Sequence, residues 1–135
     1  MRILPFFVVF VMAFDCNLSY RLNIEKIISD AETIRDGEAS YYAKSKRYAP
    51  LQELIDAWYV GTELADGKDA GFFIEVNATE EHYSLSIYPD YSQGIVKSGD
   101  EEQPSIYCDE TGVLRVSFDP NKRADAVSSQ MRPKH

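Results

Sequence analysis

The sequence has few of the residues on which metal sites and nucleophilic catalysis are built. Its 135 residues include two cysteines and two histidines, of which only His82 lies away from the C-terminal end. Two cysteines and one such histidine are too few for a four-ligand zinc site. In the body of the chain His82 also has no second histidine, neighbouring cysteine or serine elbow motif with which to build a nucleophile, so we expect it at a strand edge.

Basic residues are scarce as well. The chain has 14 Lys and Arg against 22 Asp and Glu, which gives a formal net charge of −8. A surface of this sign repels phosphate backbones, so nucleic acid is not an expected partner. Internal repeats and low-complexity segments are absent, and a hydrophobic share of 44% is enough for the core of one domain.

Long hydrophobic runs are limited to residues 3–14, which follow the basic Arg2. This run is too short to span a bilayer but has the length of a signal h-region, so we predict that residues 1–16 are an export signal. Three fates are open. The chain is cleaved after Ala13, or Cys16 carries lipid as in a bacterial lipoprotein, or the run stays attached as a helix that dips into the membrane.

The two cysteines bear on this choice. In an oxidising compartment a disulfide between Cys16 and Cys108 would close a long loop and stabilise the fold by about 4 kcal/mol. That bond cannot form if Cys16 is lipidated. The favoured interpretation is that Cys108 is a small buried residue on a strand.

Residues 22–44 have the pattern of one amphipathic helix. Apolar residues recur at steps of three and four and form a single stripe: Ile24, Ile27, Ile28, Ala31 and Ile34. Pro50 then suits the first turn of a short second helix, whose apolar face residues 58–60 would cover and which Gly61 would end. Residues 62–71 are expected to be a loop.

After residue 71 the period changes from about four to two. Residues 72–77 and 83–88 alternate as two antiparallel strands, and residues 105–108 and 113–118 flank a turn that begins at Asp109 and closes at Gly112. Residues 119–135 have no periodicity and are expected to be a flexible tail. The sequence therefore predicts an α+β domain over residues 17–118, with one long helix and one short helix on a three- to four-stranded antiparallel sheet.

Several short motifs stand in a characteristic order: Ser40-Tyr41-Tyr42, then residues 46–54 (KRYAPLQEL), then Gly71-Phe72, then residues 105–115 (SIYCDETGVLR). Together they resemble the globular part of the type IV pilin and type II secretion pseudopilin family. Residues 1–16 lack the Gly cleavage site and the Glu of a prepilin, so the resemblance implies a stand-alone pilin-like protein with its own export signal. It also implies a non-enzymatic module in the periplasm or cell envelope that binds a protein partner.

Clustered acids offer a second hypothesis. Asp90, Asp100, Glu101 and Glu102 lie in the polar stretch of residues 90–102, and hard cations such as calcium accept clustered oxygens. Some pseudopilins bind calcium in such a loop, so the alternative function is a calcium-dependent binder, or a small secreted enzyme or inhibitor that uses this loop. No alternating calcium-loop spacing is present, and solvated turn acids are the favoured interpretation. No other cofactor is expected.

The rich aromatic content suggests where a partner would dock. Alternation places Tyr88 and Tyr107 on the sheet face opposite Leu85 and Ile106, and Tyr91 follows in the connection after the strand. Tyrosines are over-used at contact surfaces. We therefore predict that these three tyrosines, together with a sheet edge, bind a protein partner.

Overall fold

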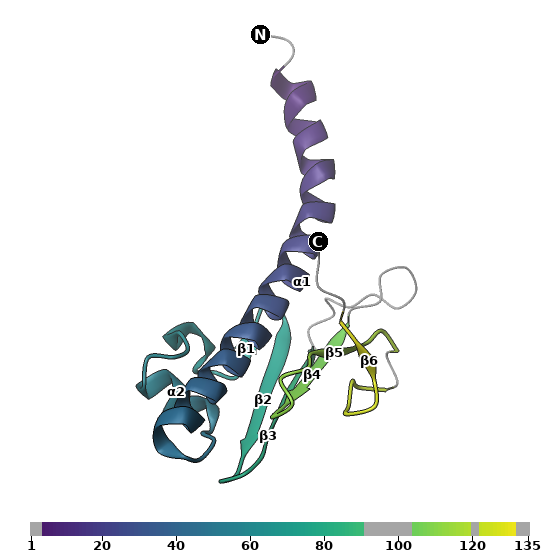
Figure 1. Cartoon of the computed structure of the whole chain (residues 1–135). Coiled ribbons are helices and arrows are strands. Elements are labelled where there is room, and N and C mark those ends of the chain that lie inside the picture. The colour runs from purple at the N-terminus through teal and green to yellow at the C-terminus, as the bar shows by residue number, and fades with distance from the viewer. Residues whose placement is uncertain (1–3, 91–103, 120–121, 132–135) are drawn as a thin grey trace.

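The computed structural model describes residues 4–90, 104–119 and 122–131, and the side chains of helix residues from Asn23 onward. A long helix lies along one face of an antiparallel sheet (Figure 1). The helices are α1 (Leu4–Ser45), α2 (Leu51–Asp56) and the 3-10 turn η1 (Thr62–Leu64). The strands are β1 (Lys68–Asp69), β2 (Phe72–Ala78), β3 (Tyr83–Pro89), β4 (Ser105–Asp109), β5 (Arg115–Ser117) and β6 (Ser129–Gln130). The α+β class is confirmed, but the sheet has six strands instead of three or four.

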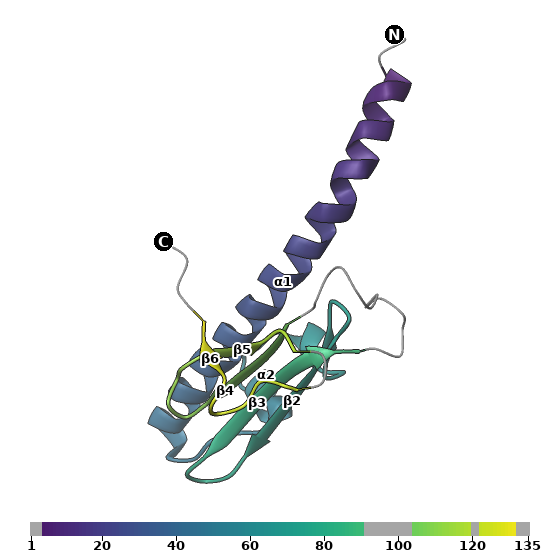
Figure 2. The same ribbon diagram turned by 90° about the vertical axis from the view of Figure 1, so that its right-hand side faces the viewer.

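Helix α1 is longer than the predicted segment. It has 42 residues and begins at Leu4, so the apolar run and the amphipathic segment form one continuous helix. No Pro or Gly interrupts residues 6–36, which explains why the helix propagates through the junction. The N-terminal half of α1 extends away from the sheet, and the C-terminal half packs on it (Figures 1 and 2). No helix of the described residues is long and apolar enough to cross a membrane.

The predicted apolar stripe of α1 is covered by the sheet. Ile27, Ala31 and Ile34 are fully buried, whereas Ile24 and Ile28 are half-buried. The residues that cover the stripe belong to the inward face of β3 and β4: Leu85, Ile87, Ile106 and Cys108. Fully burying one isoleucine side chain is worth about 1.5–3 kcal/mol, so this seam is a principal source of stability.

Gly37 lies inside α1 because a neighbouring chain segment approaches closely there. A Cβ atom at Gly37 would lie 3.1 Å from the Cβ of Tyr59, which is tighter than ordinary carbon contact. The missing side chain lets the turn after α2 pack directly on α1. This packing gain offsets the roughly 1 kcal/mol that Gly costs in a helix interior.

The sheet is a meander in the order β1-β2-β3-β4-β5-β6, with every neighbouring pair antiparallel. Ala70 and Gly71 connect β1 to β2 with φ values of 51° and 83°, as a two-residue type I′ hairpin requires. The predicted turn between β4 and β5 is confirmed. Gly112 has φ 76°, its N–H donates to the Asp109 carbonyl at 2.9 Å, and the Asp109 carboxylate accepts from Thr111.

The two additional strands lie at the sheet edges, in segments predicted to be irregular. The segment of residues 62–71 contains η1 and β1 instead of a plain loop. The described part of the expected tail contains β6, which pairs with β5, and a buried Ala124 whose N–H donates to Ser105 Oγ at 2.7 Å. Strands of two residues are too short to show an alternation of apolar and polar residues, so no sequence pattern predicts them.

Trp58 does not cover the apolar face of α2, contrary to the prediction. It is 89% exposed and has φ 66°. The N–H groups of Trp58 and Tyr59 donate to the carbonyls of Ile55 and Leu54, which is a Schellman ending with Trp58 at the left-handed position. That conformation turns the indole into solvent and leaves Val60 buried.

We expect truncation of Ile34 to destabilise the domain strongly, because the site is fully buried and the neighbouring side chains cannot close the cavity that the missing atoms leave. Ile34→Ala should lower the free energy of unfolding by about 3 kcal/mol, measured by urea denaturation. The half-buried Ile24 provides the matched control, and Ile24→Ala should cost about 1 kcal/mol or less. Equal losses for the two variants would contradict the assigned seam.

Candidate functional site

Tyr88, one of the three predicted anchors, lies on the outer face of the sheet but is half-buried and already engaged. Its hydroxyl donates to Glu75 on the neighbouring strand. The Arg123 guanidinium lies 3.5 Å from the centre of its ring, and its ring centroid is 5.4 Å from that of Phe73. A cation held over an aromatic face is favourable, so a partner that used this ring would have to displace Arg123.

Tyr107, the second predicted anchor, lies on the same outer face, in β4. Its hydroxyl donates to Asp109 Oδ2 at 3.2 Å, and the residue is half-buried. Burial, followed by the Asp109 charge, raises the pKa of Tyr107. The alternation argument thus placed both tyrosines on the correct face, but neither is freely exposed. Tyr91 lies outside the described residues.

Asp90 is buried instead of lying in an open acidic loop. It is 3% exposed, its backbone N–H donates to the Gly71 carbonyl at 2.9 Å, and Lys68 Nζ lies 3.5 Å from its carboxylate. Asp100, Glu101 and Glu102 lie outside the described residues. Within the described part of the chain, no three His, Cys, Asp or Glu side chains are grouped closely enough to hold a metal ion.

Cys108 is a free thiol on β4, fully buried in the core, as the favoured interpretation expected. Its sulfur lies 3.7 Å from the hydroxyl of the buried Tyr83. Burial raises the pKa of the Cys108 thiol, which disfavours the reactive thiolate. The side chain of Cys16 lies outside the described set.

His82 lies in the turn that leads into β3 and pairs with the opposite hairpin. Its Nδ1 is 2.6 Å from Glu110 Oε1, and 69% of the histidine side chain is exposed. The pair joins the β2–β3 turn to the β4–β5 turn. Sequence reasoning placed His82 near a strand edge but gave it no partner, because the two turns are 28 residues apart.

A groove of about 600 Å³ opens at this end of the sheet. We call it the β2-edge groove. Pro50 and residues 76–79 form one part of its lining, and the His82–Glu110 pair, Tyr107 and Asp109 form another. Backbone of a sheet edge and carboxylates of the β4–β5 turn therefore face the same space. No local sequence signal marks the groove, because three distant segments create it.

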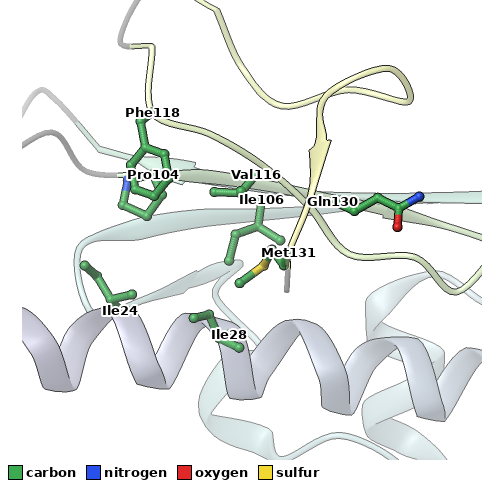
Figure 3. A pocket seen from close by; sticks show the side chains of 8 residues that line it. All are labelled: Ile24, Ile28, Pro104, Ile106, Val116, Phe118, Gln130 and Met131. Atoms are coloured by element: carbon green, nitrogen blue, oxygen red, sulfur yellow. The ribbon is translucent and has the colours of Figure 1, made fainter. Parts of the chain in front are cut away.

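A second, apolar groove of about 190 Å³ lies between α1 and the far edge of the sheet. Ile24 and Ile28 on α1 face Ile106 and Met131 across it, and Phe118 stands beside Pro104 at one end (Figure 3). Gln130 points to the side, away from Ile106 and Met131. The half-buried state of Ile24 and Ile28 reflects this opening, where the strands no longer cover the stripe.

Two carboxyl groups face each other where α1 crosses β1. Lys26 Nζ lies 3.0 Å from Asp69 Oδ1, and the buried Oδ2 atoms of Asp30 and Asp69 have no ordinary hydrogen-bond donor. Burial, then hydrogen bonding to Asp69 and its charge, raises the pKa of Asp30 to about 8. Burial acts to raise the pKa of Asp69, but hydrogen bonds from Asp30 and Lys26 outweigh it and lower that pKa. One proton held between the two carboxyls satisfies this arrangement.

Glu38 is a fully buried carboxyl on the covered side of α1. Its Oε1 accepts the N–H of Ala49 at 2.8 Å, whereas its Oε2 is buried without a partner. Burial raises the pKa of Glu38 to about 7. Sequence reasoning overlooked this residue, although a step of four from Ile34 continues the stripe to position 38.

Comparisons of the chain with protein-family models, with curated proteins and with solved structures found no match.

The buried acids predict a stability that falls as the pH rises. Asp30 and Glu38 keep their protons to about pH 8 and about pH 7 in the folded chain, but release them near their ordinary values of 3.8 and 4.5 when unfolded. The folded state therefore binds more protons between about pH 4 and about pH 8, and stability is lost across that window. Urea unfolding midpoints should decline from about pH 5 to about pH 9.

Asp30→Asn should flatten this decline, because an amide stays neutral and can donate to Asp69. We expect the variant to be more stable than the wild type at about pH 9 and similar at about pH 5. Asp36→Asn, at an exposed position of the same helix, should leave the slope unchanged. An Asp30→Asn variant with the wild-type slope would show that no proton is held there.

Proposed function

We propose that the protein is a non-enzymatic, exported module of the bacterial cell envelope, built like the globular part of a type IV pilin or pseudopilin, and that it binds a protein partner. The observation that carries this proposal is the continuity of α1. One helix contains residues 4–14 of the apolar run in the half that extends away from the sheet, and the sheet-covered stripe in its other half (Figure 1). A head carried on such a helix suits a protein held at a membrane or within an assembly.

The order of elements supports the same proposal. A long helix precedes an antiparallel meander, and the motif of residues 105–115 forms a hairpin whose turn is organised by Asp109 and Gly112. This is the arrangement that the resemblance to pilin heads implies. The binding surface would be the outer sheet face, where Tyr88 and Tyr107 lie on β3 and β4, together with the sheet edges.

The acidic-loop alternative receives no comparable support. Its first residue, Asp90, is buried and paired with Lys68, so its carboxylate is already neutralised by an ammonium group. A calcium ion that used Asp90 would have to break this ion pair. We therefore propose the envelope module alone.

The apolar run should direct export. Residues 1–21 fused to a phosphatase that is active only outside the cytoplasm should give active enzyme in a bacterial host. Placing charges in the middle of the run, with Val8→Asp and Val9→Asp together, should lower that activity by about tenfold or more, because each Asp costs about 3 kcal/mol in an apolar membrane environment.

Ser19→Asp, outside the run, is the matched control and should keep the activity of the parent fusion. If the parent fusion is inactive, the prediction that residues 1–16 direct export is wrong. The intact mass of the full-length protein, recovered from the envelope fraction, then separates a chain cleaved after Ala13, a chain lipidated on Cys16 and an uncleaved chain.

A further inference from the structure

The outer edge of β2 has unused pairing capacity beyond the end of β1. Strand β1 pairs only with Phe72 and Phe73, and the next bond on that side runs from the Ile74 N–H to the Gly67 carbonyl at 2.8 Å. Alternate residues of a strand point their N–H and C=O groups to the same side. Val76 and Ala78 therefore direct their backbone groups outward, as Ile74 does.

Within the described chain, no backbone group pairs with this part of the edge. The ladder with β3 takes the alternate residues of β2, and the open stretch ends where the Tyr48 N–H donates to the Thr79 carbonyl at 3.3 Å. β2 thus forms the margin of the sheet beyond β1 (Figure 2). Four residues of open edge, 75–78, span about 13 Å, which suits a short extended segment.

The β2-edge groove adjoins this edge and extends over the outer face of the sheet, because Asn77, Ser84 and Asp109 lie side by side on neighbouring strands. Its lining carries the carboxylates of Asp109 and Glu110, and no Lys or Arg side chain is among the described residues that line it. Three exposed acids lie next to the groove on β2 and its turn: Glu75, Glu80 and Glu81. The charge of Arg47 acts on Glu80, but the acids around the edge outnumber this cation, so the charge favours a basic ligand.

We propose that the outer edge of β2 receives an extended, Lys- or Arg-bearing segment of a partner protein, which adds to the sheet as a strand. The N–H and C=O groups of Val76 and Ala78 supply the main-chain pairing. The exposed carboxylates of β2 and its turn, Glu75, Glu80 and Glu81, select basic side chains. This inference rests on the proposed partner-binding function and specifies its site and the chemistry of the partner.

The probe is a fluorescent peptide in which Lys alternates with Val and Thr, titrated against the full-length protein. It should bind, and an acidic peptide with Glu in place of Lys should not. Val76→Pro removes one outward N–H and leaves the bonds to β3 intact, since Pro is tolerated where the N–H of an edge strand faces solvent. We expect at least about tenfold weaker binding for this variant.

Val76→Ala keeps the N–H and is the matched control, with expected affinity within about twofold of the wild type. Equal binding by wild type and a folded Val76→Pro variant, binding of the acidic peptide, or no binding of the basic peptide would each overturn the inference. If Val76→Pro does not fold, a basic peptide with alternate N-methyl groups replaces it. Loss of binding then supports strand addition, and unchanged binding overturns it. None of these results alters the export measurement.

Discussion

The whole structure depends on the burial of one side of α1 against β3 and β4. Ile27, Ala31 and Ile34 have no exposed surface, and the inward residues Leu85 and Ile87 have none either. Neither layer is stable alone, because a six-stranded sheet with an uncovered apolar face and a single helix with an apolar stripe each leave that surface in water. This apolar contact fixes α1 on the sheet, and α2 and β1 are then attached to α1.

Among the described residues, buried carboxyl groups on α1 lie where another segment is attached to the helix. Glu38 holds the N–H of Ala49 at the entrance to α2, and Lys26 with Asp69 joins α1 to the first strand. A buried carboxyl is expensive unless it is protonated or paired. Both acidic positions meet that condition, which makes the attachment of α2 and β1 sensitive to pH while the apolar part of the seam is not.

Elements with a clear hydrophobic period could be predicted from the sequence. Elements that form only through tertiary contacts could not. The stripe of α1, the alternation in β2 and β3, and the turn at Gly112 all followed from local pattern. β1 and β6 are too short to show a period, and Trp58 turned outward because a helix ending required a left-handed residue there. The β2-edge groove joins three distant segments, so no local pattern could reveal it. The pilin-like relationship and the envelope location remain predictions.

Natural sheets usually protect their edges, and the two margins of this sheet differ in how they do so. At β6 the strand is only two residues long and the adjoining segment covers the outer face through Arg123 and Tyr88. At β2 a protecting strand of the same length leaves the outward backbone groups of Val76 and Ala78 without a strand partner among the described residues, and exposed acids lie beside them. Negative charge repels further copies of this acidic chain but attracts a basic segment. The same negative charge that opposes pairing with a second copy would therefore favour a partner of opposite charge.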